Sequence, residues 1–234
     1  MKKLLALILA LTLAASLFGC AQTPDEASPS PEPDASPSEP DASPSDSTHT
    51  AEPSPAEEPI PVEVGGRLAL GEYNGEPIEW RILDIADGKA FVIAENCVAV
   101  RNYSDMGSAV TWENCTLRYW LNGEFYAAAF SDSEQRLIVQ TAISNPDNAL
   151  YNIPGGNDTS DKIFVLSIDE ANLYFYDGSG AAAFEGKTIW WWLRSPGANT
   201  GNAASVDIDG IDRAGGLGVN EFTAGVRPAM WVTL

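Results

Sequence analysis

Short apolar or alternating runs open the aromatic-rich part of the chain, and this pattern is typical of β-strands. The runs cover 67–70, 78–85 and 89–94. Asp87 and Gly88 separate the last two runs, and an Asp-Gly pair between strands favours a tight hairpin turn. We therefore predict an antiparallel hairpin centred on Gly88.

Helical spacing replaces this alternation in the middle of the chain. The stretch 111–121 places its large apolar residues on one face, with Thr111 or Asn114 available as the N-cap. The Asn-Gly pair at 122–123 is expected to end this helix. A run with acidic residues first and apolar residues last, 132–138, predicts another short helix.

Strand-like runs return in the C-terminal third. The elements predicted there are a buried strand at 163–166, a short helix opened by a capping box at 167–170, and strands at 188–193, 203–208 and 226–234. Strands thus lie at both ends of the folded region and helices lie between them, without strand–helix–strand alternation. The predicted fold class is α+β.

An Asp-Gly pair at 209–210 predicts a further hairpin turn. Asp207 and Asp212 flank this pair, and we place Asp207, Asp209 and Asp212 on the solvent face of the hairpin. Their spacing is similar to part of a calcium-binding loop, but no Glu follows at the twelfth position of such a loop. We therefore favour the hairpin and predict no metal site.

Composition then separates the N-terminal quarter from the rest. Residues 1–19 begin with two lysines and continue with an apolar run, which is typical of an export signal. The segment 17–20, LFGC, resembles the bacterial lipobox, which implies that Cys20 is lipidated and becomes the mature N-terminus. Two acyl chains anchor a protein stably, so we predict attachment to the extracytoplasmic face of the cell membrane. A plain secretory peptide with an incidental cysteine is the alternative.

Residues 20–64 are rich in Pro, Ser and acids and contain no Lys, Arg or aromatic residue. Such a segment lacks the apolar surface needed for a core, so we predict a disordered stalk. The remaining 65–234 is a normal size for a single domain. Because the net charge of the chain is −20 and no basic run occurs, nucleic acid is an unfavourable partner.

Two stretches near the C-terminus carry a resemblance. The segments 191–197, WWLRSPG, and 225–231, GVRPAMW, are similar to the signatures of an uncharacterised bacterial family of surface and lipoprotein domains. Further matching pieces lie at 80–84, 111–118, 120–122 and 164–167. These domains resemble the C-type-lectin-like fold used by formylglycine-generating enzymes and variable surface proteins. The resemblance implies a lectin-like domain whose terminal strands pair and whose later loops contact a ligand.

Few residues offer nucleophilic or metal chemistry. The single histidine, His49, lies in the predicted stalk, so the domain lacks Ser-His and Cys-His pairs and histidine-containing zinc sites. Cys97 and Cys115 form a disulfide or remain buried thiols, and sequence spacing does not distinguish these states. The reactive cysteine pair of formylglycine-generating enzymes has no counterpart here, which argues against oxidase chemistry. We predict no cofactor.

The candidate binding residues lie in loops that flank the signature strands. The proposed ligand contacts are Trp192, Asn199, Thr200, Asn202 and Asn220. Ordinary surface turns are the alternative for these polar residues. Structural roles are assigned to Trp112, Trp120, Trp191, Arg194 and Arg227. A guanidinium near the core requires carboxylates or carbonyls as partners, and the candidate carboxylates are Glu79, Asp84 and Glu113.

These observations predict a lipid-anchored, non-catalytic module that binds a glycan or a protein at the cell surface. One alternative is an extracellular hydrolase that uses two carboxylates, although no spacing singles out such a pair among the acids of the domain. The other alternative is a structural or assembly module of the cell envelope, which would expose a large apolar patch.

Overall fold

The computed structural model describes residues 62–234. The predicted export signal 1–19, the lipidation site Cys20 and nearly all of the predicted stalk 20–64 lie outside the described residues.

The first sheet contains four antiparallel strands in the order β1-β2-β3-β13. Its strands are β1 (Arg67–Tyr73), β2 (Glu76–Ala86), β3 (Lys89–Ala94) and β13 (Ala229–Thr233). The predicted hairpin around Gly88 is confirmed, because β2 pairs with β3 through a turn in which Asp87 and Gly88 have φ values of 51° and 70°. Positive φ at both central residues matches the twist of a two-residue hairpin.

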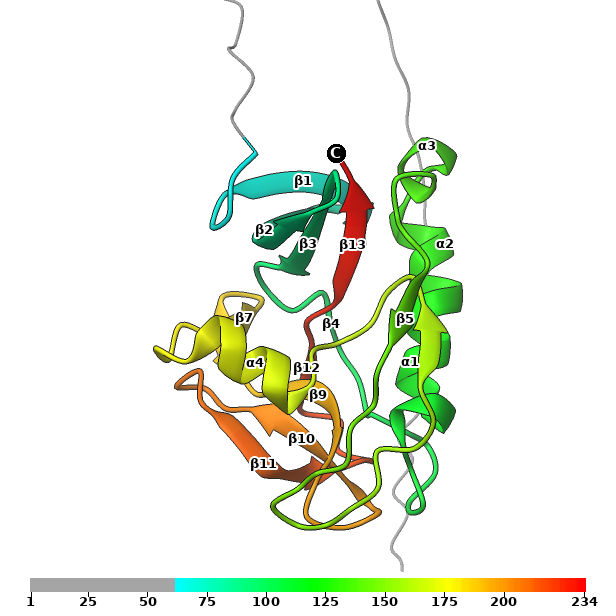
Figure 1. Ribbon diagram of the computed structural model, residues 1–234, viewed down its shortest axis with the longest axis vertical. Coiled ribbons are helices and arrows are strands. Elements are labelled where there is room, and N and C mark those ends of the chain that lie inside the picture. The colour runs from blue at the N-terminus through cyan, green and yellow to red at the C-terminus, as the bar shows by residue number, and fades with distance from the viewer. Residues whose placement is uncertain (1–61) are drawn as a thin grey trace, which may run out of the picture. The chain divides into compact units, whose positions relative to one another are not determined.

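The prediction that the terminal strands pair is wrong. β13 pairs with β3, and two strands separate it from β1 in the same sheet (Figure 1). The burial of each strand explains this order. β3 is buried along almost its whole length, so it needs hydrogen-bond partners at both edges. β1 is half exposed and therefore suits the edge of the sheet.

Four short helical segments follow one another along one side of the domain (Figure 1). They are η1 (Trp112–Asn114), α1 (Thr116–Trp120), the π-helical turn η2 (Leu121–Phe125) and α2 (Tyr126–Ala129). The predicted break at 122–123 is wrong, because Asn122 joins the helix to a neighbouring segment. Its Nδ2 donates to the carbonyls of Arg118 (3.1 Å) and Ile163 (2.8 Å), and its Oδ1 accepts from the Lys162 N–H (2.8 Å).

The predicted helix at 132–138 is shorter than expected. Helix α3 (Asp132–Gln135) begins after Ser131, whose side chain accepts the N–H of Glu134. The last residues of the predicted helix leave it, and Ile138 instead bridges to Val232 of β13. Pairing with the first sheet thus replaces the final helical turn.

The second sheet has the strand order β11-β10-β9-β12-β4. Its strands are β4 (Ala99–Val100), β9 (Trp191–Pro196), β10 (Asn202–Val206), β11 (Asp212–Gly218) and β12 (Gly225–Val226). The other short strands form two pairs, β5 (Thr141–Ile143) with β6 (Thr159–Asp161) and β7 (Ala182–Phe184) with β8 (Lys187–Ile189). The described domain is therefore a sheet-rich α+β structure with a few short helices.

Helix α4 (Ile168–Phe175) lies between the two sheets (Figure 1). The capping box predicted for it is confirmed, because the Ser167 hydroxyl accepts the Glu170 N–H at 3.1 Å and Glu170 bonds back to the Ser167 N–H at 2.9 Å. The segment 163–166 before it is buried as predicted, but only Phe164 makes a strand bridge, with Ala229.

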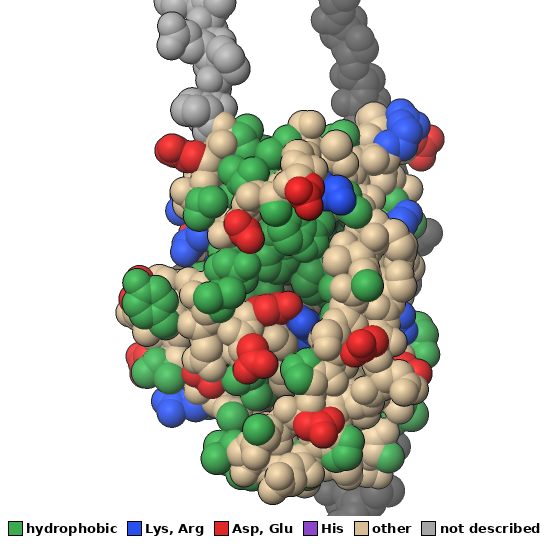
Figure 2. All heavy atoms as spheres, in the orientation of Figure 1, with side chains coloured by type: hydrophobic (Ala, Val, Ile, Leu, Met, Phe, Trp, Pro, Cys, Tyr) green, Lys and Arg blue, Asp and Glu red, His purple; other side chains and the backbone are tan. Residues whose placement is uncertain are grey.

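Aromatic rings connect the elements around α4. Phe91 stacks on Phe164 and on Trp231, with ring centroids 5.8 and 5.2 Å apart, and Tyr174 of α4 lies 5.6 Å from Phe91. Hydrophobic side chains line a hollow between the first sheet and α4 (Figure 2). Packing of this kind fixes the helix against β3 and β13.

The hairpin between β10 and β11 forms, but its acids are not all on the solvent face. Asp207 is buried, and its Oδ1 accepts the N–H groups of Asp209 (2.9 Å) and Ile211 (3.0 Å). Its Oδ2 accepts from Nε of Arg213 at 2.7 Å. Ile208 and Ile211 are instead exposed at the turn. The prediction is wrong for Asp207, because the turn uses this carboxylate to satisfy its own backbone donors.

Within residues 62–234, no helix is both long enough and apolar enough to cross a membrane.

Candidate functional site

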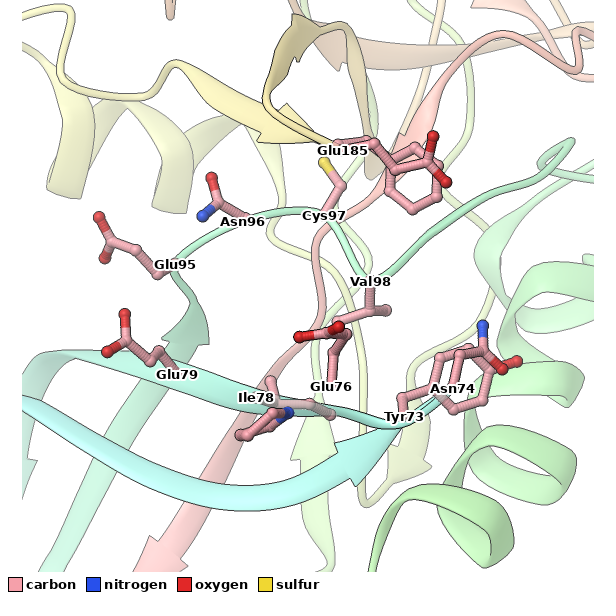
Figure 3. A pocket seen from close by; sticks show the side chains of 12 residues that line it. Tyr73, Asn74, Glu76, Ile78, Glu79, Glu95, Asn96, Cys97, Val98 and Glu185 are labelled. Carbon is pink, nitrogen blue, oxygen red and sulfur yellow. The ribbon is translucent and has the colours of Figure 1, made fainter.

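The tips of two hairpins and a connecting segment surround an open cavity of about 630 Å³ (Figure 3). One wall is the turn and first strand residues 73–79 of the β1–β2 hairpin, and another is the β7–β8 tip at Phe184 and Glu185. The segment 95–98, which follows β3, forms the floor. Three segments far apart in the sequence therefore contribute to one cavity.

Both hairpin tips use two successive residues with positive φ. Asn74 and Gly75 have φ values of 54° and 83°, and Glu185 and Gly186 have φ values of 49° and 74°. Asn and Gly commonly adopt this conformation, whereas a glutamate there is unusual. The turn at Glu185 holds an exposed carboxylate at the rim of the cavity.

Hydrogen bonds fix the floor to the neighbouring strands. The Cys97 N–H donates to the Ala183 carbonyl of β7 at 2.9 Å, and Oδ1 of Asn96 accepts the Ala183 N–H at 3.2 Å. The Val98 N–H donates to the Val226 carbonyl of β12 at 2.9 Å. The floor is thus hydrogen-bonded to β7 and to β12. These bonds hold the cavity in shape before a ligand enters.

Glu95 is held by two arginines at one side of the floor. Its Oε2 accepts from Nε of Arg81 at 2.8 Å, and its Oε1 accepts from Nη2 of Arg67 at 3.0 Å. The hydrogen bond from Arg81 lowers the pKa of Glu95 below its ordinary value of 4.5 and outweighs the opposing effect of partial burial. Glu95 is therefore ionised near neutral pH and its charge is compensated.

Three other carboxylates line the cavity without such compensation. Glu76, Glu79 and Glu185 are exposed, and no basic residue of the described part of the chain forms a salt bridge with them. The cavity lining contains no Lys or Arg. In Figure 3, Glu76 lies on the β1–β2 hairpin near Val98, and Glu79 lies opposite Glu95. The interior of the cavity therefore has a negative potential.

Apolar groups make up the rest of the lining. Tyr73 and Phe184 contribute rings, and Pro77, Ile78 and Val98 contribute aliphatic surface. A cavity with an apolar lining and a few convergent polar groups is the usual form of a ligand site.

The Cys97 thiol at the floor is not activated. Burial raises its pKa to about 12, so the thiol is neutral near pH 7. Cys115 is also a free, buried thiol, and burial raises its pKa to about 12 as well. The disulfide alternative is therefore not formed in this structure, and both cysteines are core residues.

Arg227 directly follows β12 and is completely buried. It forms no salt bridge with a carboxylate of the described residues. Its Nε donates to the Ala94 carbonyl at 2.8 Å and its Nη1 donates to the Gly180 carbonyl at 3.1 Å, while the guanidinium lies about 5 Å from the rings of Phe175 and Trp191. Burial lowers its pKa to about 10. Of the two kinds of partner expected, carbonyls are confirmed here, whereas none of the candidate carboxylates binds Arg227; aromatic faces also lie against this cation.

Arg194 does pair with a carboxylate, but not with a predicted one. Its two terminal nitrogens bind both carboxylate oxygens of Glu170, with Nη2 to Oε1 at 2.8 Å. It also donates to the carbonyls of Val165 and Ser144. This fork joins β9 to α4. Glu79 and Glu113 lie elsewhere, in the cavity and beside Asn157.

The tryptophans assigned structural roles are all buried. Trp191 and Trp112 have no exposed surface, and Trp120 is 5% exposed. The Trp112 Nε1 donates to Oδ2 of Asp161 at 2.9 Å, and Arg101 lies over the Trp120 ring at 4.6 Å. These rings form part of the core.

Trp192 cannot contact a ligand in this structure, because it is completely buried. Its ring packs 5.6 Å from that of Tyr103 and its Nε1 donates to the Arg101 carbonyl at 2.8 Å. The expected ligand contact of Trp192 is wrong because both faces of β9 are covered. Trp191 on the other face packs against Phe175.

The remaining predicted contacts lie in loops near the second sheet. Asn199, Thr200 and Asn220 are exposed and Asn202 is partly buried. Oδ1 of Asn199 accepts the Gly201 N–H at 2.8 Å, so this side chain stabilises its own turn. None of these four side chains lines the cavity between the hairpin tips.

Sequence reasoning missed the acidic cavity. The Asn-Gly pair at 74–75 is a visible hairpin signal, and Glu185-Gly186 is a weaker one. Neither signal indicates that the two turns lie beside the segment 95–98. That proximity depends on the pairing of β3 with β13 and on the contact between the floor and β7.

A family model described as Domain of unknown function (DUF6273) matches residues 87–234. The chain belongs to this family. No curated protein and no solved structure matched the chain. The DUF6273 match includes the cavity floor and Glu185, whereas the wall at 73–79 precedes the matched residues.

Proposed function

We propose that this chain is a lipid-anchored, extracytoplasmic binding module whose lectin-like domain holds a glycan or a protein at the cell surface without catalysis. Anchorage is through Cys20, and the segment 20–64 separates that anchor from the domain. The observation that carries the proposal is the preformed cavity between the two hairpin tips.

The size and lining of the cavity support binding. Its volume of about 630 Å³ falls in the range of about 300–1,000 Å³ usual for ligand sites. Its floor is hydrogen-bonded to β7 and β12. A preformed site costs little ordering entropy when a ligand enters. A concave site of this kind also favours binding over the assembly alternative.

The lectin-like part of the proposal has separate support. That support is the resemblance carried by the segments 191–197 and 225–231, whereas the pairing of the terminal strands that the resemblance implies is not observed. Exposed loops at Asn199, Thr200 and Asn220 flank the second sheet and offer additional polar contacts near Asn202. Rigid strands that carry polar loops are a common basis for recognition.

The hydrolase alternative would use the same cavity, since Glu79 lies opposite Glu95 in Figure 3. Glycoside hydrolysis requires one carboxyl group that stays protonated to act as the acid. Glu95 cannot fill that role, because its pKa is lowered by Arg81. The thiol of Cys97, with a pKa of about 12, is also unsuited to nucleophilic attack near neutral pH.

A binding screen tests the proposal. The full chain, purified in detergent, is applied to a glycan array and a peptide array, and hits are measured by calorimetry. Val98→Phe narrows the cavity and is expected to abolish binding, whereas Val64→Phe, at an exposed site outside the cavity, is its matched control. Asn199→Asp keeps the turn oxygen and separates a loop contribution from that of the cavity.

Catalysis would overturn the proposal. If the full chain hydrolyses an arrayed glycan or peptide and Glu79→Gln abolishes that turnover, the protein is an enzyme. Anchorage is tested by cell fractionation of Cys20→Ser, which is expected to leave the membrane fraction or to remain unprocessed. Unchanged membrane retention of a processed Cys20→Ser protein would contradict lipidation.

A further inference from the structure

The first sheet turns one face toward α4, and a row of three residues crosses that face. Asp84 of β2 pairs with Phe91 of β3, and Phe91 pairs with Trp231 of β13. Residues that pair directly across strands have their side chains on the same face of a sheet. Phe91 is 4% exposed, whereas Asp84 and Trp231 are only partly buried. The row therefore has an aromatic centre and a solvent-accessible side chain at each end.

Helix α4 supplies the opposite side of the hollow between the first sheet and this helix. Its Tyr174 is partly exposed and lies 5.6 Å from Phe91, with the two ring planes inclined at 58°. The Trp231 ring stacks on Phe91 with an angle of only 21° between the planes. Figure 2 shows the hollow open to solvent, lined by hydrophobic side chains and with acidic and basic groups around it. Two partly exposed rings from different elements thus border one recess.

Two polar groups beside these rings retain hydrogen-bonding capacity. Asp84 forms no salt bridge within the described residues, and its Oδ1 accepts the Ile85 N–H at 2.8 Å. Its Oδ2 can accept from a ligand. Burial raises the pKa of Tyr174 above its ordinary value of 10, and the negative charges of Asp84 and Glu170 raise it further. The Tyr174 hydroxyl therefore lies near both carboxylates and stays protonated, so it can donate as well as accept.

The charges around the hollow balance one another. Lys89 lies on the same face of β3 as Phe91 and forms no salt bridge within residues 62–234, so its ammonium offsets the charge of Asp84. Glu170 of α4 is already compensated by Arg194. A recess without net charge attracts neither anions nor cations strongly, and it therefore favours a neutral ligand.

A sugar ring has the surface that this combination recognises. Its C–H groups form apolar faces that pack against aromatic rings, and the hydroxyl groups at its edge both donate and accept hydrogen bonds. The hollow offers the rings of Trp231 and Tyr174, the Asp84 carboxylate as an acceptor and the Tyr174 hydroxyl in either role. A purely apolar ligand would cover these polar groups without giving them partners, which costs free energy.

We propose that the hollow between the first sheet and α4 binds a neutral oligosaccharide, with one sugar ring against Trp231 and Tyr174 and its hydroxyl groups bonded to Asp84. None of these three residues lines the cavity between the hairpin tips, so the hollow is a second site. This assignment rests on the proposed binding function and names a glycan as its ligand.

The test titrates the full chain with chitotetraose, cellotetraose and maltotetraose, each at up to millimolar concentration, in a calorimeter. The protein is kept in a detergent without a sugar headgroup, because such a headgroup would compete. At least one of these neutral tetramers is expected to bind. Trp231→Leu should weaken binding about tenfold or more through loss of the stacking face, and Tyr174→Phe and Asp84→Asn about threefold each through loss of one hydrogen bond.

Matched controls separate contacts with the sugar from effects on folding. Tyr176→Phe makes the same change directly after α4, where Tyr176 is 86% exposed, and Asp87→Asn makes the same change in the exposed β2–β3 turn. Both controls are expected to bind normally. Trp231→Phe keeps an aromatic face and should recover part of the affinity that Trp231→Leu loses. Val98→Phe, which narrows the cavity, is expected to leave tetramer binding unchanged.

The outcomes distinguish this assignment from the wider function. Failure of all three tetramers to bind, or normal binding by a folded Trp231→Leu, would overturn the site in the hollow. Tetramer binding that is lost in Val98→Phe but kept in the hollow variants would also overturn it and leave the binding module intact. Tighter binding of an oligoproline peptide than of every tetramer would contradict the choice of a sugar. Release of shorter sugars would instead contradict the non-catalytic function on which the assignment rests.

Discussion

The two candidate regions of this domain use their polar groups in opposite ways. In the loops near the second sheet, the Asn199 side chain bonds its own turn, and Asn148 donates to the carbonyls of Pro196 (2.7 Å) and Ala214 (2.9 Å). In the cavity, the carboxylates of Glu76, Glu79 and Glu185 form no salt bridge within the described residues. Polar groups that bond within the fold stabilise loops, whereas unpaired, solvent-exposed carboxylates remain available to a ligand.

The loops near the second sheet are also packed more tightly than the hairpin tips at the cavity. A Cβ atom at Gly197 would lie 2.6 Å from both the Asn202 Cβ and the Gly215 carbonyl, so these loops are tightly packed. At the β7–β8 tip, a Cβ on Gly186 would meet nothing within 4 Å. The loops therefore act as a framework, and the hairpin tips border open space. Three predictions test this contrast.

The largest effect is expected for Gly216→Ala in β11. Gly216 has φ of 63°, and a Cβ there would collide with the Ala203 carbonyl of β10. We expect the free energy of unfolding to fall on the order of 3 kcal/mol or more, because both strain and backbone displacement contribute. Chemical denaturation measures this. Gly186 has a similar φ of 74°, but a Cβ there would meet no other atom within 4 Å. Gly186→Ala should therefore lower the free energy of unfolding by only about 1–2 kcal/mol. Equal losses would contradict the contrast.

An intermediate effect is expected from acid. The hydrogen bond from Arg81 lowers the pKa of Glu95 in the folded protein below its ordinary value of 4.5. The ionised carboxylate therefore stabilises the fold fully at pH values above 4.5. That contribution is lost as the pH falls below 4.5 and through the lowered value. At pH 7 the wild-type protein should unfold at a higher urea concentration than Glu95→Gln. The difference between the two unfolding midpoints should be smaller at pH 3. A gap that is constant with pH would contradict the role of the pair. Glu79→Gln, without a salt bridge, is the control.

The smallest effect is a gain. Glu185→Asn places a residue that tolerates positive φ at the β7–β8 tip, and we expect it to stabilise the fold by about 0.5 kcal/mol. Thermal unfolding measures this change. Combined with weaker ligand binding at the cavity, the gain would show that Glu185 serves the cavity at the expense of its turn. A loss of stability would indicate that the carboxylate supports the fold.

Local signals in the sequence were reliable where they involved neighbouring residues. The Asp87-Gly88 turn and the Ser167 capping box form as predicted, because each depends on contacts within a few residues. The Asn122-Gly123 break failed because the Asn122 side chain bonds to Ile163, 41 residues away. Trp192 failed because alternation along a strand does not reveal whether a second layer covers its other face.

The cavity depended entirely on distant contacts. Its walls and floor come from 73–79, 95–98 and 184–185, and no periodicity links these segments. The Asn-Gly and Glu-Gly pairs mark the turns but not their neighbours. The charge pattern along the sequence does not predict which glutamate is paired. Glu95 contacts two arginines and Glu79 contacts none, but nothing in the sequence around them distinguishes the two.

The sequence by itself determined the division between an acidic, proline-rich segment and an aromatic domain, the α+β class and the local turns, because composition and short-range hydrogen bonding are properties of adjacent residues. Tertiary structure decided which strands pair, which tryptophans are covered and which carboxylates stay unpaired. Those outcomes arise from packing between residues far apart in the chain, where burial and charge compensation depend on every neighbouring element.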